Sequence, residues 1–365
     1  MIFLPYIYCQ MSNQKRYKIG VIGAGWIAKA HMEFLRKTGR AEITWIAARN
    51  PDNLEKVRSD YGIPHKTHDY RDILKDPSVD VVLIATPPDL HREQFIETLE
   101  AGKHVLLEKP MALNREELEE MMRVKAEHPG LIAMDCSARH SRLNPKFTFV
   151  KELISSGALG EVYHIHHQHV TRQKRPGIEF HPVAKWFLDR SRAGGGPLFD
   201  WGVYDLSFHL GLLGDRPGLD RVLQAVLKSG LDDVDPGTPV YDVEEHLVVE
   251  MQLTGGISYY WERGVNAHME VGNETRIYGT RGGIKLAYCT WDDPEIILYD
   301  LDEQGRARKQ TYVKECPEEE DGYYLSRHLI EVLDGDAEPV VPLETAKKHM
   351  EMILRCREAA DASLS

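Results

Sequence analysis

The chain has 365 residues, of which 42% are hydrophobic and 28% are charged, proportions typical of globular proteins. This length is sufficient for two domains with separate cores, and no segment is apolar over the length of a membrane span. The formal net charge of −12 argues against nucleic-acid or anionic-membrane partners, because both select basic surfaces.

The cysteines and the N-terminal segment give a first indication of the compartment. The five cysteines are scattered and include no CxxC pair, which predicts reduced thiols in the cytoplasm rather than disulfides or a zinc site. Residues 1–16 begin with an apolar segment that contains Pro5 but has no basic start or cleavage site. We therefore expect an N-terminal extension without function, and not a signal peptide. Met11 offers an alternative start.

A strand, a glycine turn and a helix are predicted at the start of the folded chain. The apolar segment 19–22 is followed by the GxGxxA pattern of Gly23, Gly25 and Ala28. A helix N-terminus offers free backbone N–H groups and the positive end of a dipole, so it can hold a pyrophosphate. Gly23 permits the turn, Gly25 lets the backbone approach phosphates, and Ala28 permits close packing. Such turns also occur for structural reasons alone, but this position favours a dinucleotide site.

Strands and helices alternate as far as about Met134, which predicts an α/β domain with a doubly wound parallel sheet. The predicted strands after the first are 43–47, 79–85, 104–107 and 131–134, and helices begin at Asn50-Pro51, His91 and Asn114. We assign residues 17–136 to this dinucleotide-binding domain. Strand signals dominate from Val222 to Val313, after a helix near 145–156 and a strand at 161–171. Residues 137–365 are therefore predicted as an α+β domain with a largely antiparallel sheet.

The stretch after the triple glycine 194–196 is the most informative part of this second half. Apolar residues from Phe199 to Leu213 step by four, three, four and three, which predicts one helix with one buried stripe. Asp200 and Tyr204 are then neighbours on an adjacent face. Such polar residues commonly form a solvated face, but a triple glycine directly before a helix predicts a close approach to the backbone.

Six motifs resemble those of a known family. The motifs are GAGWIA at 23–28, ATPPDLH at 85–91, AGKHVLLEKPMA at 101–112, RLNP at 142–145, GGGPLFDWGVYD at 194–205 and YGTRGG at 278–283. On these motifs the sequence resembles the glucose–fructose oxidoreductase / inositol dehydrogenase (Gfo/Idh/MocA) family from Tyr17 to the last helix. The resemblance implies a Rossmann domain, a C-terminal open-faced sheet domain and a nicotinamide site between them.

The resemblance also implies a catalytic set. In such proteins the lysine of EKP, here Lys109, reaches the substrate hydroxyl, and the D-x-x-x-H pair corresponds to Asp200 and Tyr204. Tyrosine in place of histidine resembles the glucose–fructose oxidoreductases and dimeric dihydrodiol dehydrogenases, where tyrosine is the acid/base. Hydride transfer requires loss of the carbinol proton, and a nearby ammonium lowers the pKa of a tyrosine from about 10. We predict Tyr204 as acid/base, Lys109 as its electrostatic partner, and Asp200 as the group that orients substrate or lysine.

Further contacts follow from the resemblance and from position. Arg142 is expected to contact the substrate together with the catalytic set. Trp186 is expected at the cofactor but also fits a contact that anchors its loop. His91 is likewise expected at the cofactor but also fits a role in fixing its loop. The histidines at 164, 166, 167 and 169 alternate between two faces of a strand, so no metal site is expected. The predicted cofactor contacts are Gly23, Gly25, Trp26, Ile27, Arg49, Asn50, Thr86, Pro87, His91, Glu108, Lys109 and Trp186.

The residues after the second strand bear on the choice of cofactor. An NAD-selective fold usually places an acid there, roughly 20 residues beyond the glycines, to hold the ribose 2′-hydroxyl. This chain instead has Arg49, which can stack on adenine and pair with a 2′-phosphate. The sequence therefore predicts a preference for NADP over NAD; alternatively, Arg49 only stacks and tolerates either cofactor.

The leading hypothesis is an NAD(P)-dependent oxidoreductase acting on a sugar, a cyclitol or a related polyol. Two alternatives stay open, a sugar-modifying or glycoside-cleaving enzyme with retained cofactor and a non-catalytic dinucleotide-binding regulator. Retention of Lys109, Asp200 and Tyr204 favours an enzyme. A sheet face without helices leaves apolar area, and the mixed residues at 163–170 fit a partly polar interface, so we expect a homodimer or homotetramer.

Overall fold

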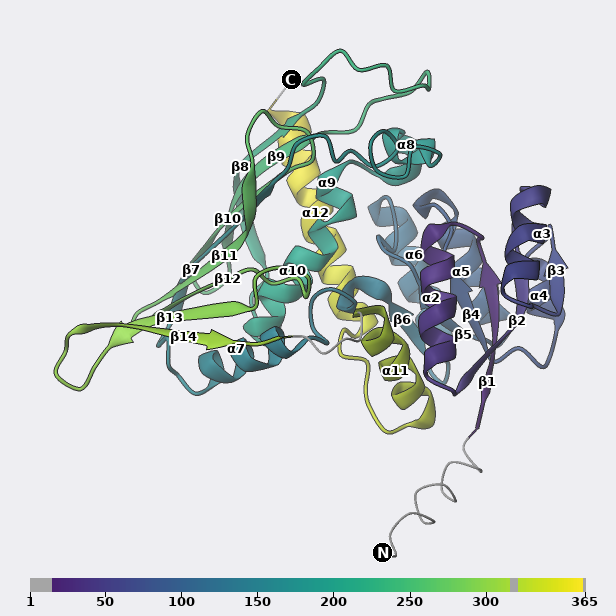
Figure 1. Cartoon of the computed structure of the whole chain (residues 1–365), viewed down its shortest axis with the longest axis horizontal. Coiled ribbons are helices and arrows are strands. Elements are labelled where there is room, and N and C mark those ends of the chain that lie inside the picture. Colours follow the sequence, from purple (N-terminus) through teal and green to yellow (C-terminus); the bar gives the residue numbers. More distant parts are fainter. Residues whose placement is uncertain (1–14, 316–320, 364–365) are drawn as a thin grey trace, which may run out of the picture.

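The computed structural model describes residues 15–315 and 321–363, which fold around two separate sheets (Figure 1). Nearly all of the predicted N-terminal extension lies outside the described residues. In the part that is described, no helix has the length and apolar character needed to cross a membrane.

The first sheet is parallel throughout, with strand order β3-β2-β1-β4-β5-β6. Its strands are β1 (Tyr17–Ile22), β2 (Ala41–Ala47), β3 (His65–Thr67), β4 (Val81–Ile84), β5 (His104–Leu107) and β6 (Ala133–Asp135). The helices between them are α2 (Trp26–Lys37), α3 (Pro51–Asp60), α4 (Arg71–Lys75), α5 (His91–Glu100) and α6 (Arg115–Glu127). Residues of β4 are wholly buried, as expected when helices cover both faces. This confirms the doubly wound sheet, whose strand order reverses between β1 and β4.

Local signals set the helix starts where the sequence predicts them. The side chain of Asn50 accepts a hydrogen bond from the Asn53 N–H at 2.9 Å, with Pro51 at the first helical position. Asn114 caps α6 through the Glu117 N–H at 2.9 Å. The sequence analysis missed β3 and α4, because β3 has only three residues and none of them is buried.

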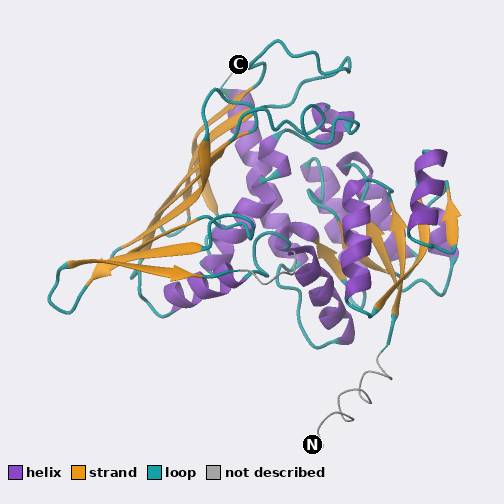
Figure 2. Ribbon diagram, viewed as in Figure 1, coloured by secondary structure: helices purple, strands orange, loops and turns teal. Residues whose placement is uncertain are grey.

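The second sheet has eight strands in the order β14-β13-β12-β11-β7-β10-β9-β8, antiparallel except for the β7–β10 pair. Helices cover only one of its faces (Figure 2), which confirms a largely antiparallel, open-faced sheet. The strands are β7 (Val162–Val170), β8 (Leu219–Lys228), β9 (His246–Leu253), β10 (Ile257–Gly264), β11 (Val271–Gly279), β12 (Gly283–Leu286), β13 (Glu295–Leu301) and β14 (Ala307–Val313). The main helices of this half are α7 (Pro145–Ser155), α10 (Gly202–Leu212) and α12 (Leu343–Ala362).

The single helix predicted after the triple glycine is wrong. The chain forms two helices, α9 (Pro197–Asp200) and α10, with a break at Trp201. In a continuous helix the Asp200 carbonyl would accept from the Tyr204 N–H. Here that carbonyl accepts from the Lys109 ammonium at 2.8 Å, and the Tyr204 N–H turns to the Trp201 carbonyl. Every residue of α10 is buried, so the helix has no solvated face.

One C-terminal helix belongs spatially to the first sheet. Helix α11 (Asp321–Asp334) packs against α2, and a Cβ at Gly322 would lie 2.2 Å from the Phe34 ring. Only glycine permits this close approach. The C-terminal part of the chain therefore packs against a helix of the first half and brings the two halves into contact.

Candidate active site

The loops after β1 and β4 meet at the reversal of strand order, the place where doubly wound sheets are expected to form a ligand crevice. Gly23 has φ +113°, and a Cβ there would lie 2.4 Å from the Ala85 carbonyl oxygen, so the turn requires glycine. Within residues 15–315 and 321–363, nothing lies within 4 Å of a Cβ placed at Gly25, and no side chain caps the N-terminus of α2. Free N–H groups beside open space fit the pyrophosphate of a dinucleotide.

Most predicted cofactor contacts lie along this edge of the sheet. Trp26, with 59% of its surface exposed, is the first residue of α2 and is followed by the half-buried Ile27. Arg49 follows β2 and is exposed, and within the described ranges no hydrogen bond or ion pair involves it. The loop after β4 brings Thr86 and Pro87 next to the glycine turn. These residues share one edge because the carboxyl ends of parallel strands lie together.

Three of the predicted contact residues have their side chains paired with other groups of the chain, and their contacts with cofactor or substrate stay predictions. His91 is fully buried, and its ring nitrogens lie 2.9 Å from the carbonyl oxygens of Thr86 and Pro110, so it fixes two loops. The Glu108 carboxylate is buried against Arg139, and Arg142 forms a bidentate ion pair with Asp215 at 2.6 Å. Buried charges need such partners, which leaves these groups occupied.

Two other predicted cofactor contacts, Asn50 and Trp186, have partners within their own segments of the chain. Asn50 serves as the cap of α3, at the same edge of the sheet as Arg49. Trp186 lies in the 3₁₀ helix η4 (Lys185–Leu188), half-buried, with its indole stacked on Phe187 at 3.8 Å between ring centroids. A cofactor contact of Trp186 stays a prediction.

Lys109 and Asp200 form the polar centre of the site. The Lys109 ammonium donates to Asp200 Oδ1 at 2.5 Å and to the Asp200 carbonyl at 2.8 Å. Their side chains keep 12% and 18% of their surface exposed, so a ligand can reach them. Lys109 follows β5, which is separated by β4 from β1 and its glycine turn, and Asp200 ends α9. The fold thus brings together two charged residues that are far apart in sequence.

The surroundings of Tyr204 differ from those predicted. Lys109 lies over the ring, 5.1 Å from its centroid, whereas the hydroxyl accepts from the Arg139 guanidinium at 2.5 Å. Tyr204 is 2% exposed, and burial raises the pKa of its hydroxyl well above 10, although Arg139 acts to lower it. Arg139, and not Lys109, is therefore the cation at the phenol oxygen, and the expected lowering of the pKa is wrong.

Two family models match the chain, one in each half. Residues 17–135 match the oxidoreductase family model with an NAD-binding Rossmann fold, and residues 147–285 match the GFO/IDH/MocA C-terminal domain. The chain belongs to the Gfo/Idh/MocA family. This confirms the resemblance, and the protein is an NAD-binding oxidoreductase of that family.

Curated relatives and solved structures of the Gfo/Idh/MocA family span nearly the whole chain. Bovine trans-1,2-dihydrobenzene-1,2-diol dehydrogenase is 26% identical over 354 residues, covering 93% of this chain and 96% of its own. Levoglucosan dehydrogenase of Pseudarthrobacter phenanthrenivorans is 28% identical over 318 residues, covering 80% of this chain and 79% of its own. A levoglucosan dehydrogenase structure with NADH and levoglucosan has a TM-score of 0.82 at 21% identity, covering 95% and 98% of the two chains.

A buried polar cluster lies beneath Tyr204 in this Gfo/Idh/MocA protein, and the sequence analysis missed it. Glu108 accepts from Arg139 at 2.8 Å and lies 2.6 Å from His31 Nε2, with the Cys136 sulfur 3.8 Å from the same nitrogen. His31, Glu108 and Cys136 are the one group in the described part of the chain whose ligand atoms are close enough to hold a metal ion. The Arg139 guanidinium already provides the positive charge there, which opposes a metal ion.

A second missed feature is an aromatic wall beside Tyr204. The His140 ring lies 4.7 Å from the Tyr204 ring and 4.9 Å from the Trp291 ring, and its Nδ1 is 2.9 Å from Asp321 Oδ2. Burial, with Arg139 nearby, lowers the pKa of His140 to about 4. Trp201 completes the wall, and Trp291 keeps 59% of its surface exposed. These residues come from distant segments with no shared spacing, so no sequence signal joined them.

Proposed function

We propose that this protein is an NAD(P)-dependent dehydrogenase that transfers a hydride between a nicotinamide and a hydroxyl-bearing carbon of a sugar, cyclitol or related cyclic diol. The partly exposed Lys109–Asp200 pair, at the carboxyl end of β5 in the parallel sheet that also carries the glycine turn, is the observation that carries this proposal. The names of the relatives support the substrate class, because one is a dehydrogenase of a dihydrobenzene diol and another of levoglucosan.

Lys109, Asp200 and the aromatic wall each have a proposed role in the reaction. When bound, the nicotinamide cofactor accepts or supplies the hydride. The Lys109 ammonium donates a hydrogen bond to the reacting oxygen and stabilises negative charge that develops there, and Asp200 holds the ammonium in place. The aromatic wall of His140, Trp201 and Trp291 fits the apolar face of a ring-shaped substrate.

Tyr204 is the proposed proton-transfer group, with Arg139 as the cation at its oxygen. An arginine at 2.5 Å stabilises a phenolate, which supports this role. Lys109 is the second candidate, because its side chain is 12% exposed whereas Tyr204 as a residue is 2% exposed. Single-turnover hydride transfer across pH, measured for Tyr204→Phe, distinguishes the two.

The decisive experiment is a panel of sugars, cyclitols, cyclic diols and glycosides offered with NAD or NADP. We expect stoichiometric change in nicotinamide absorbance and a carbonyl product. Glycoside cleavage with a catalytic amount of retained cofactor would instead support a redox-assisted cleaving enzyme. Dinucleotide binding without any turnover would support a regulator.

The proposed cofactor preference is NADP, based on the exposed Arg49 after β2 and the lack of an acid at that position. A guanidinium can pair with a 2′-phosphate, which NAD does not carry. The levoglucosan dehydrogenase structures contain NADH, so the competing expectation is acceptance of both cofactors.

We also propose a homodimer or a dimer of dimers through the open face of the second sheet. Large apolar side chains are exposed on its strands, among them Tyr163, Leu223 and Leu301 at 52%, 49% and 61%. Light scattering that gives a monomer at micromolar concentration would reject this. The domain division at residues 136 and 137 stays a proposal. A cytoplasmic location is likewise proposed, and the buried, unpaired thiols of Cys136, Cys289 and Cys356 support it.

A further inference from the structure

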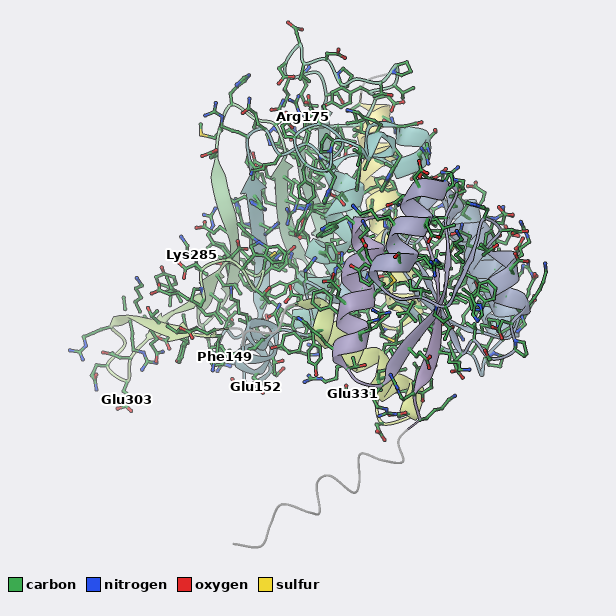
Figure 3. All side chains as sticks on the ribbon, turned by 45° about the vertical axis from the view of Figure 1, so that its right-hand side comes forward. Phe149, Glu152, Arg175, Lys285, Glu303 and Glu331 are labelled. Atoms are coloured by element: carbon green, nitrogen blue, oxygen red, sulfur yellow. The ribbon has the colours of Figure 1, made fainter. Side chains whose placement is uncertain are left out.

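Residues 171–184, here called the strap, lead from β7 toward the crevice and have a fixed base. Arg175, with 3% of its side chain exposed, pairs with Glu179 at 2.5 Å, Asp232 at 2.7 Å and Glu245 at 3.0 Å. Figure 3 shows Arg175 above the strands of the second sheet. Within the strap the Gly177 N–H donates to the Phe180 carbonyl at 2.7 Å. The strap is therefore a defined structure held at its base by ion pairs.

The tip of the strap contacts the start of the dinucleotide turn. The His181 ring lies 4.8 Å from the Trp26 ring, and the Phe180 ring lies 6.4 Å from it. Trp26 directly follows Gly25, so this contact joins the second half of the chain to the turn proposed to hold the pyrophosphate. His181 has φ +51°, a left-handed conformation that is uncommon for a residue other than glycine. Such strain persists where surrounding contacts impose it, and it often marks a functional position.

One atom at this tip is buried without a partner. Among the residues that the structure describes, none forms a hydrogen bond with His181 Nε2, although water cannot reach that atom. Burial lowers the pKa of His181, and the Asp200 carboxylate acts against this. A buried nitrogen left unpaired is unfavourable, so a shift of the tip that brings this nitrogen to a ligand oxygen would be stabilising.

A second contact holds the following segment over the crevice. Helix α8 (Arg190–Ala193) lies above α2, α5 and α6 in Figure 1. Arg192 Nε is 3.3 Å from the Asp89 carboxylate in the 3₁₀ helix η2 (Pro88–Leu90), which follows β4. The second half of the chain thus contacts the first half next to two of the loops that line the crevice.

We propose that His181 and Trp26 form a clasp over the nicotinamide half of the bound dinucleotide, in which the tip of the strap shifts on binding so that His181 Nε2 contacts a pyrophosphate or ribose oxygen and slows cofactor release. The clasp rests on the proposed function, because it requires that the crevice bind a nicotinamide dinucleotide. The contact of His181 with Trp26, the first residue after the glycine turn, favours the cofactor over the substrate as the ligand.

The test compares variants that keep the backbone of the strap. Glycine and asparagine both accept a positive φ, so His181→Gly removes the imidazole and His181→Asn keeps a shorter hydrogen-bonding group. NADH and NADPH binding to the full chain is followed by stopped-flow energy transfer from tryptophan, without substrate. We expect His181→Gly to weaken binding about tenfold, mostly through faster dissociation, and His181→Asn to lose less. Val183→Ala, at a strap residue that is 92% exposed, is the control and should bind as the unmodified protein does.

A second variant tests the clasp from its other side. Trp26→Ala removes an exposed side chain from the start of α2 and should speed dissociation as His181→Gly does. Unchanged affinity and dissociation rate in His181→Gly would overturn the clasp, as would an unchanged affinity combined with a raised KM for the substrate. Failure of the unmodified protein to bind either dinucleotide would overturn the proposed function, and the clasp with it.

Discussion

Asp200 and Asp205 are carboxylates five residues apart in the same motif, and their environments are opposite. Asp205 is fully buried and contacts Arg263 through both oxygens, at 2.5 and 2.7 Å, with Tyr288 and Trp261 as further donors. Asp200 is 18% exposed, and among the residues that the structure describes its carboxylate pairs with Lys109 alone. A carboxylate with all its acceptor sites filled is structural, whereas one with sites left over can bind a ligand.

The electrostatics of the buried pair support this distinction. Burial acts to raise the pKa of Asp205, but Arg263 and His167 outweigh it and hold that pKa well below the usual range. Arg263 also lies 4.4 Å from the centre of the Trp201 ring, so the buried pair supports one side of the aromatic wall. The comparison teaches that one motif can carry both the reactive pair and the pair that positions its surroundings.

The largest expected effect is on catalysis at the exposed pair. Lys109→Met and Tyr204→Phe should each lower kcat by roughly two to four powers of ten, because each removes a group proposed to stabilise or transfer charge. The free energy of unfolding, measured with urea, should change by only about 1–2 kcal/mol for Lys109→Met, because water reaches the Asp200 carboxylate left behind. Lys109→Arg keeps the charge with altered geometry and should retain partial activity. Near-normal rates with an unaltered pH profile in Tyr204→Phe would move the proton-transfer role to Lys109.

The second effect is on stability at the buried pair. Asp205→Ala leaves the Arg263 guanidinium uncompensated and should lower the free energy of unfolding by about 3–5 kcal/mol. Urea denaturation monitored by circular dichroism measures it. Tyr288→Phe, which removes one donor to Asp205 and no charge, is the matched control and should cost about 1 kcal/mol. Equal losses in the two variants would contradict the assignment of a structural ion pair to Asp205.

The third effect is the pH dependence of stability that His140 produces. The His140 ring lies beside Trp201, which stands in the chain between Asp200 and Asp205. Its pKa is about 4 in the folded chain and near 6.5 when unfolded, so the unfolded state takes up the proton first as the pH falls. The contribution of His140 to the free energy of unfolding is therefore fully present above about pH 6.5. About 2–3 kcal/mol of it is lost as the pH falls from 6.5 to 4. His140→Gln keeps a donor for Asp321 but does not titrate. The free energy of unfolding, measured at pH 7, 5.5 and 4.5, should fall less steeply with decreasing pH for this variant than for the unmodified protein. Parallel curves for the two proteins would contradict the prediction.

The smallest expected effect concerns the exposed end of the crevice. Arg49→Ala should lower the ratio of kcat/KM for NADP over NAD by about tenfold, because one charged contact to the 2′-phosphate is lost. Lys56→Ala, on the neighbouring helix α3, tests whether any loss of positive charge has the same result. A ratio unchanged by Arg49→Ala would leave only adenine stacking for this residue.

Much of the fold and part of the site could be predicted from local sequence. The alternating strands and helices, the cap at Asn114 and the turn at Gly23 depend on residues within a few positions of one another. Such features are predictable because hydrogen bonds, sterics and burial periodicity act over short stretches of chain. Lys109 and Asp200 were predicted instead from the resemblance of their motifs to those of the Gfo/Idh/MocA family.

Tertiary structure alone decided which groups surround those residues. Arg139 reaches Tyr204 across 65 positions, Lys109 takes the Asp200 carbonyl across 91 and breaks the predicted helix, and His181 contacts Trp26 from the other half of the chain. None of these contacts has a periodic or spacing signal. The desolvation that raises the Tyr204 pKa and leaves His181 Nε2 unpaired arises only when the two halves pack together. The sequence by itself determined the strands, the turns and the reactive residue types, and packing determined their partners and their charge.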